Sequence, residues 1–213
     1  MSESIKHSIL LVDDHPLMRR GMRQLLELQD DFNVIGEASN GEEALVCVPE
    51  LQPDLILLDN NMPQLNGIET LKRLRQNGYR GTILIFTVSD AENEVRDAMR
   101  HGADGYLLKD MDPDLLIVQI RDALNGVIVV SPALTRVLAQ ALRAPASTVE
   151  FELTDRERQV LKSIATGSSN KVIAQKLGIT EGTVKVHVKN LLHKLGLRSR
   201  VEAAVWALAH MKG

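Results

Sequence analysis

The sequence predicts two domains: an α/β domain built on a five-stranded, doubly wound parallel sheet, and then a smaller all-α domain of four helices. Two observations predict this division. Five short aliphatic runs alternate with longer segments of helical period in the first part of the chain. Residues 153–213, in contrast, contain no segment of strand period and no proline. A repeated β-then-α order implies parallel strands, because such crossovers return in the same direction with one hand.

The strands are expected at residues 8–13, 32–37, 54–59, 82–87 and 105–109. Several of these runs lack the alternation of a half-exposed strand, as expected when helices cover both faces of a parallel sheet. Helical patterns fill the intervals, with apolar residues three and four apart, at 15–28, 41–49, 66–76, 91–101 and 112–125. Gly78 and Gly102 stand where two of these helices should end, after basic residues of the last turn.

Charge divides the chain in the same way. We expect a first domain over residues 1–125, a linker with a short helix (131–143) over 126–150, and a second domain over 151–213. The first domain carries 12 Lys and Arg against 22 Asp and Glu, a net charge of −10, whereas residues 151–213 carry 11 against 5, a net of +6. An acidic and a basic domain suggest different partners, although two solvated surfaces with a chance imbalance would look the same.

Composition predicts a soluble, cytoplasmic protein. The hydrophobic fraction of 44% is ordinary for a globular chain. No window approaches 18 consecutive apolar residues, and the first apolar run is short and ends in two acids, unlike a signal peptide. The single cysteine, Cys47, cannot form an internal disulfide, which fits a reducing compartment.

Polar residues stand at the carboxyl ends of the predicted strands, where open α/β sheets bind ligands. Asp13 and Asp14 follow the first strand and Asp59 ends the third, while Thr87 and Lys109 end the fourth and fifth. Three carboxylates brought together repel one another unless a cation neutralises them, and an oxygen-rich set suits Mg²⁺. A lysine and a hydroxyl opposite them can bind the oxygens of a phosphoryl group. The pattern therefore indicates a carboxylate nucleophile that accepts a phosphoryl group.

With these residues, the stretches LLVDDHPLMRRG, PDLILLDNNMPQLNGIETL and HGADGYLLKD resemble the flavodoxin-like receiver domain of bacterial response regulators over residues 8–125. The resemblance implies that Asp59 is the phosphoacceptor and that Lys109 binds the phosphoryl group. It also implies that Thr87 and Tyr106 are a switch pair: the hydroxyl bonds the phosphoryl group, and the ring turns inward in response.

The same resemblance implies a Mg²⁺ cofactor held by Asp13, Asp14, Asp59 and the backbone carbonyl of Asn61. Asn60 departs from the family, which usually has an apolar residue at this position. Its amide could weaken packing beneath the loop or alter the lifetime of the phosphoryl group. We expect instead that Asn60 faces solvent without effect, since polar side chains near loops are commonly solvated.

The basic domain contains a helix-turn-helix candidate. A short helix in SNKVIAQKLGI ends near Gly178, and EGTVKVHVKNLLHKL forms the next helix. That second helix has an apolar stripe of Val184, Val188, Leu191, Leu192 and Leu195, and another face with Lys185, Lys189 and His193 near Val186. Such a helix can enter the major groove of DNA. Alternatively, its lysines only keep an ordinary bundle helix soluble.

The opening LTxRE, the core NKxIAxxLxIxxxTVKVHxxxLxxKL and the ending RxEAAxxA resemble the LuxR-type DNA-binding domain of the NarL/FixJ family. TVKVHVK and SRVEAAVW are most similar to the nitrate/nitrite regulators of that family. The resemblance implies that Lys185, Val186 and Lys189 read bases. It also implies a dimer surface on the last helix, at Val201, Val205 and Leu208, although from the sequence alone this stripe could equally be core.

We therefore expect a phosphorylation-switched transcription regulator rather than a multiple-turnover enzyme. A sensor histidine kinase would donate the phosphoryl group. The resemblance implies that the resting receiver covers residues 181–195, and its release would let a homodimer bind an inverted repeat in double-stranded DNA. We expect no membrane partner. One rival is a phosphohydrolase or metal-dependent transferase that uses the acidic cluster. Another is a DNA-binding protein whose receiver only dimerises, and a protein-interaction adaptor would leave the basic helix unexplained.

Overall fold

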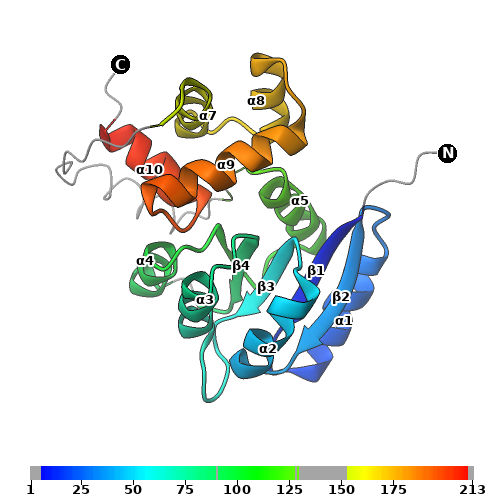
Figure 1. The fold of residues 1–213 in the computed structure, drawn as a ribbon. Helices are drawn as coiled ribbons and strands as arrows, with labels where there is room; N and C mark the ends of the chain where they lie inside the picture. Colours follow the sequence, from blue (N-terminus) through cyan, green and yellow to red (C-terminus); the bar gives the residue numbers. More distant parts are fainter. Residues whose placement is uncertain (1–5, 90, 128, 130–152, 211–213) are drawn as a thin grey trace.

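The computed structural model describes residues 6–89, 91–127, 129 and 153–210, which form an α/β domain followed by a helical domain (Figure 1). The described part of the first domain contains a five-stranded sheet in the order β2-β1-β3-β4-β5. The strands are β1 (His7–Val12), β2 (Phe32–Ala38), β3 (Leu55–Asp59), β4 (Thr82–Thr87) and β5 (Gly105–Leu108). Each strand pairs in parallel with its neighbours, so the predicted doubly wound sheet is confirmed.

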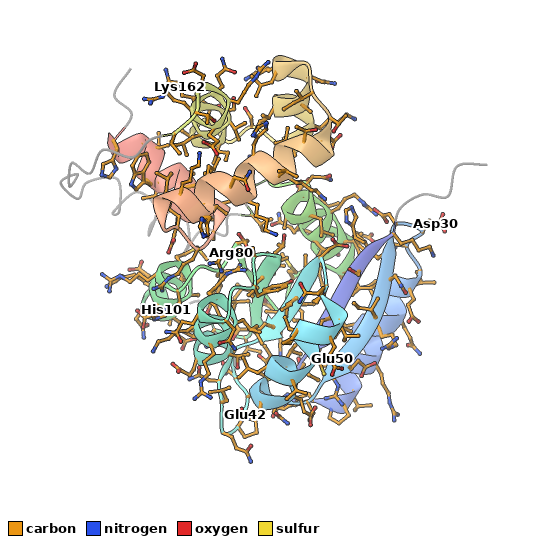
Figure 2. All side chains as sticks on the ribbon, viewed as in Figure 1. Asp30, Glu42, Glu50, Arg80, His101 and Lys162 are labelled. Carbon is orange, nitrogen blue, oxygen red and sulfur yellow. The ribbon has the colours of Figure 1, made fainter. Side chains whose placement is uncertain are left out.

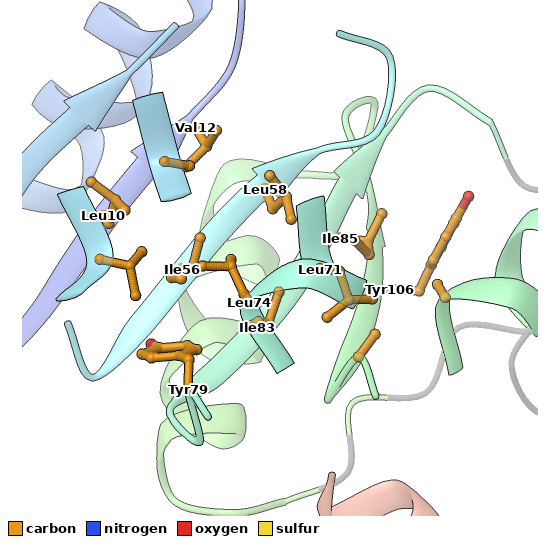
Figure 3. Packing of buried hydrophobic residues seen from close by; sticks show 14 of the residues in the cluster. Leu10, Val12, Ile56, Leu58, Leu71, Leu74, Tyr79, Ile83, Ile85 and Tyr106 are labelled. Atoms are coloured by element: carbon orange, nitrogen blue, oxygen red, sulfur yellow. The ribbon is translucent and has the colours of Figure 1, made fainter. Parts of the chain in front are cut away.

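Helices cover both faces of this sheet, which is why the strands are apolar without alternation. One face carries α2 (Gly41–Leu51), α3 (Gly67–Gln76) and α4 (Glu92–Arg100), and the other carries α1 (Pro16–Glu27) and α5 (Pro113–Leu124). In β1, Leu10 and Val12 pack toward the first face, and Ile9 and Leu11 toward the second. Figure 3 shows part of the first layer, which includes Leu10, Val12, Ile56, Leu58, Ile83 and Ile85 of the strands with Leu71 and Leu74 of α3.

Local signals set the ends of the helices beside the site. The Asn66 side chain accepts a hydrogen bond from the Glu69 amide at 2.8 Å and begins α3. Gly78 and Gly102 follow α3 and α4 with φ angles of +89° and +93°. Only glycine adopts such angles readily, so the helix ends predicted at these two glycines are confirmed.

The second domain has its own apolar core. Its described helices are α7 (Asp155–Ala165), α8 (Asn170–Leu177), α9 (Glu181–Leu195) and α10 (Arg200–His210), which confirms the predicted four-helix domain. They bury a cluster that includes Val160, Leu161, Ile164, Ile173, Val184, Leu191 and Ala203. The helix expected at 131–143 lies outside the described residues. Among the helices that the structure describes, none is long and apolar enough to span a membrane.

Candidate functional site

The carboxyl ends of β1, β3 and β5 bring three charged side chains together. Asp59 is the last residue of β3 and is 1% exposed, and Asp13 follows β1 and is 5% exposed. The Lys109 ammonium, which follows β5, lies 2.8 Å from Asp13 Oδ2 and 2.9 Å from Asp59 Oδ2. Residues 96 positions apart in the chain therefore meet at one edge of the sheet.

The charges of this cluster support one another. Burial opposes the charge on Lys109, but the hydrogen bonds and attraction from Asp13 and Asp59 outweigh it and raise the pKa of the Lys109 ammonium. Lys109 therefore stays protonated at neutral pH. A permanent cation beside a buried carboxylate suits the binding of a phosphoryl oxygen.

The acidic side of the cluster fits a divalent cation. Ligand atoms of Asp13, Asp14, His15 and Asp59 lie within 4.8 Å of one another. Within the described residues, Asp14 Oδ1 and Asp59 Oδ2 are buried, and they lie 2.8 Å from His15 Nδ1 and 2.9 Å from Lys109 Nζ, respectively. Carboxylate oxygens with unused lone pairs are the ligands that Mg²⁺ prefers.

His15 was not among the residues predicted from the sequence. Its Nδ1 lies 2.8 Å from Asp14 Oδ1, and its side chain is 67% exposed. Imidazole suits softer metals than Mg²⁺. We therefore regard His15 as a residue that contacts the acids and not as a Mg²⁺ ligand. Its place directly after Asp13 and Asp14 was the only available signal.

The predicted switch residues lie beside the cluster. Thr87 ends β4 fully buried, and its hydroxyl donates to Asn61 Oδ1 at 3.4 Å. The backbone N–H of Asn61 donates to Asp59 Oδ1 at 3.1 Å. Tyr106 is also fully buried, and its hydroxyl donates to the Ser89 carbonyl at 2.9 Å. The aromatic ring is therefore already turned inward while the two domains are in contact.

The expectation for Asn60 was wrong. This side chain is 8% exposed and does not face solvent. Its Oδ1 accepts a hydrogen bond from the Ile68 amide at 3.2 Å, and its Nδ2 donates to Glu94 Oε2 at 3.0 Å. The α3 helix begins so close to the end of β3 that water is excluded, and the amide is buried with both of its polar atoms bonded.

Gly67 makes that close approach possible. Its amide donates to the Asn60 carbonyl at 3.1 Å, and an added Cβ would lie 2.2 Å from the Asp59 carbonyl oxygen. No side chain fits at this separation, so any larger residue must push α3 away from the strand that carries Asp59.

We expect Gly67→Ala to destabilise the first domain by about 1–3 kcal/mol, a typical cost of overpacking. The measurement is urea unfolding followed by circular dichroism. Gly21→Ala is the matched control, because an added Cβ there meets nothing within 4 Å and alanine favours the interior of α1. Equal stability of Gly67→Ala and the wild type would contradict the tight contact.

The recognition-helix candidate faces the first domain. Lys185 and Lys189 of α9 are exposed, yet they line a cavity of about 440 Å³ between the domains. The opposite wall includes Pro53, Asp54, Tyr79 and Arg80. Figure 2 labels Arg80 and His101 on the side of the α/β domain that faces the helical domain.

The other predicted contacts on this helix point into solvent. Val186 is 56% exposed, and His193 is exposed as well. The apolar stripe predicted for α9 is confirmed, because Val184, Leu191, Leu192 and Leu195 are buried and Val188 packs partly buried against them.

Direct contacts also join the domains at residues that line this cavity. The backbone N–H of Asn170 donates to the backbone carbonyl of Asn125 at 2.9 Å. The backbone N–H of Arg200 makes a long hydrogen bond of 3.4 Å to Asp104 Oδ1. The Arg200 side chain is 8% exposed and donates to Asn170 Oδ1 at 3.1 Å. Burial lowers the pKa of Arg200 to about 10, so this guanidinium remains charged at neutral pH.

The last helix supplies an apolar contact to the same interface. Val201, at the start of α10, is 3% exposed and joins the core cluster of the first domain. Val205 is half-buried, and Leu208 is 51% exposed. Part of the predicted dimer surface is thus covered within the chain.

An acidic edge with a lysine opposite, on a doubly wound sheet joined to a helix-turn-helix domain, defines a response regulator that binds DNA. Residues 9–121 match the response regulator receiver domain, and residues 152–207 match the bacterial regulatory proteins of the luxR family. The chain belongs to the response regulators of NarL/FixJ type.

Similar proteins share both domains. The nitrate/nitrite response regulator NarL of Escherichia coli K12 is 53% identical over 209 residues, with 97% of each chain covered. The nitrate/nitrite response regulator NarP of the same strain is 47% identical over 206 residues, with 96% of each covered. Among solved structures, the response regulator ChrA of a heme-sensing two-component system has a TM-score of 0.52 at 33% identity, covering 95% of this chain and 96% of that one.

Proposed function

We propose that this protein is a transcription regulator of a two-component system, switched by phosphorylation of Asp59 and responding to nitrate or nitrite. The observation that carries the proposal is the position of Asp59, a buried carboxylate at the end of β3, 2.9 Å from Lys109 and beside two further acids. The nitrate or nitrite signal rests on the similarity to NarL and NarP along nearly the whole chain.

The residues of the cluster divide the work of phosphoryl transfer. Asp59 attacks the phosphorus of a phosphohistidine on the sensor kinase, the P–N bond breaks, and the imidazole leaves. Lys109 binds an oxygen of the transferred group and Thr87 donates its hydroxyl to another. Asp13, Asp14, Asp59 and the Asn61 carbonyl would hold Mg²⁺, which supplies positive charge against the phosphoryl oxygens.

The contact between the domains supports masking as the means of control. Lys185 and Lys189 line a cavity walled by the receiver, whereas a recognition helix must lie within a major groove about 12 Å wide. A duplex that docks along α9 would have to displace the receiver residues that form the other wall of this cavity. Phosphorylation would favour a separated state in which α9 binds DNA, and α10 is free for a second copy of the chain.

We expect the fragment of residues 150–213 to bind DNA about 5- to 150-fold more tightly than the unphosphorylated full chain, the usual range of such coupling. The probe is DNA that the fragment selects from a random pool, and fluorescence anisotropy measures the affinity. The fragment retains its own core, which circular dichroism would verify.

The full chain provides the control for this experiment. Beryllofluoride with Mg²⁺, a mimic of the phosphoryl group, should raise its affinity toward that of the fragment. Equal affinities of the fragment and the untreated full chain would contradict masking. A full chain that binds tightly with or without the mimic would instead favour the phosphorylation-independent rival.

A further inference from the structure

A chain of hydrogen bonds leads from the residue beside Asp59 to the helix α4. Asn60 Nδ2 donates to Glu94 Oε2 at 3.0 Å, although the two residues are 34 positions apart. The Tyr106 hydroxyl lies 3.4 Å from that same Glu94 oxygen and 2.9 Å from the Ser89 carbonyl. A single carboxylate in the first turn of α4 therefore contacts both the loop after Asp59 and the buried aromatic ring.

The other end of α4 touches the DNA-binding domain. The Arg198 guanidinium donates to the Arg100 carbonyl at 3.3 Å and lies 3.4 Å from His101 Nδ1. α10 packs beside α4 (Figure 1). α4 is nine residues long and contains both contact points, Glu94 in its first turn and Arg100 at its end, so a rigid displacement of the helix would reach the domain interface.

The loop between Thr87 and α4 is held at the same point. The Ser89 amide donates to the Thr87 hydroxyl at 3.3 Å, and the Ser89 carbonyl accepts from Tyr106. When Thr87 turns its hydroxyl to a phosphoryl group, Ser89 loses this partner. The hydrogen bond from Asn60 to Glu94 does not involve Thr87, so it can still join the loop after Asp59 to α4 in that state.

We propose that Asn60 and Glu94 are a positioning pair that transmits the state of Asp59 to α4 and so to the domain interface. The pair does not touch the phosphoryl group. It keeps the first turn of α4 attached to the loop that follows Asp59, so that α4 moves when this loop moves. This inference rests on the proposed function, since it assumes that Asp59 is phosphorylated and that the domains separate.

Asn60 also has a purely structural contact, its bond from the Ile68 amide. The test must therefore include Glu94, which lacks any role in beginning α3. Glu94→Ala removes the acceptor of the Asn60 bond together with the 3.4 Å contact from the Tyr106 hydroxyl. Asn60→Leu removes both bonds of the Asn60 side chain with a residue of similar size, and the double variant combines the two changes. Glu94→Gln keeps an oxygen that accepts from Asn60, and Asp97→Ala removes an exposed acid elsewhere on α4.

Each full-length variant is phosphorylated by a small phosphodonor with Mg²⁺ and then tested for labelling and for DNA affinity. We expect labelling of all variants at Asp59 to match the wild type. The gain in DNA affinity on phosphorylation should fall about fivefold in Asn60→Leu and Glu94→Ala. In the double variant, the gain in DNA affinity should be no smaller than in the single variants, because both substitutions break the same link. Glu94→Gln and Asp97→Ala should retain the full gain.

The outcomes separate this inference from the proposed function. A full gain in both single variants, or losses that add in the double variant, would overturn the positioning role and leave the proposed function intact. If Asp97→Ala loses as much of the gain in DNA affinity as Glu94→Ala does, the positioning role would also be overturned, because the effect would then come from the charge of α4. A wild-type chain that takes no phosphoryl group, or gains no affinity from one, would overturn the proposed function and the positioning role together.

Discussion

Asp59→Asn is expected to abolish labelling by a phosphodonor, seen as complete loss of the hydroxylamine-labile phosphoryl group. The amide lacks the anionic oxygen that attacks phosphorus, and it removes one of the two carboxylates paired with Lys109. In cells, the same variant should lose any nitrate-dependent change in its occupancy of the genome, which chromatin sequencing with and without nitrate would measure.

Asp54→Asn is the matched control for this experiment. Asp54 lies just before β3, at the amino end of the same strand, where its carboxylate accepts bonds from the Ser8 amide and hydroxyl at 2.9 Å. It is therefore remote from the phosphoryl site along the strand, and its variant should be labelled normally. Full labelling of Asp59→Asn would move the acceptor to another carboxylate.

Removing Lys185 and Lys189 is expected to cost most of the specific DNA affinity of the phosphorylated chain. A good base contact contributes about 1–3 kcal/mol, so each alanine substitution should weaken binding roughly 5- to 150-fold. Where a lysine contacts phosphate instead, the loss of affinity should be similar for all DNA sequences. The slope of the logarithm of the binding constant against the logarithm of salt concentration should then fall in magnitude by about one. Anisotropy titrations at several salt concentrations distinguish these results.

Lys162→Ala removes the same charge from the exposed side of α7, at a position labelled in Figure 2. Its affinity should stay close to that of the wild type. If Lys162→Ala weakens binding as much as Lys185→Ala does, the lysines of α9 act only through net charge, as in an ordinary soluble helix.

The cluster around Asp59 could be foreseen because it depends on chain direction alone. Parallel strands place their carboxyl ends at one edge, so acids, a threonine and a lysine at successive strand ends had to approach one another. The alternation of aliphatic runs and helical patterns was equally local, and it predicted both domains and the buried stripe of α9.

Contacts between distant segments could not be foreseen in this way. Asn60 is polar and adjoins a loop, which suggested solvent, but the packing of α3 and α4 buried it against Glu94. Val201 had an apolar pattern consistent with a dimer surface or with core, and the structure covers it with the receiver. In both cases the contacting residues lie far away in the sequence, so the hydrophobic periodicity of a short segment does not identify them.

By itself, the sequence determined the two domains, the strand ends that carry Asp13, Asp59 and Lys109, and the basic face of α9. The reason is that backbone period and strand direction are properties of short segments. Only the tertiary structure decided that Asn60 reaches Glu94 and that Lys185 faces the receiver. Those arrangements depend on how whole elements pack, because close packing leaves each side chain only the neighbours that the assembled fold provides.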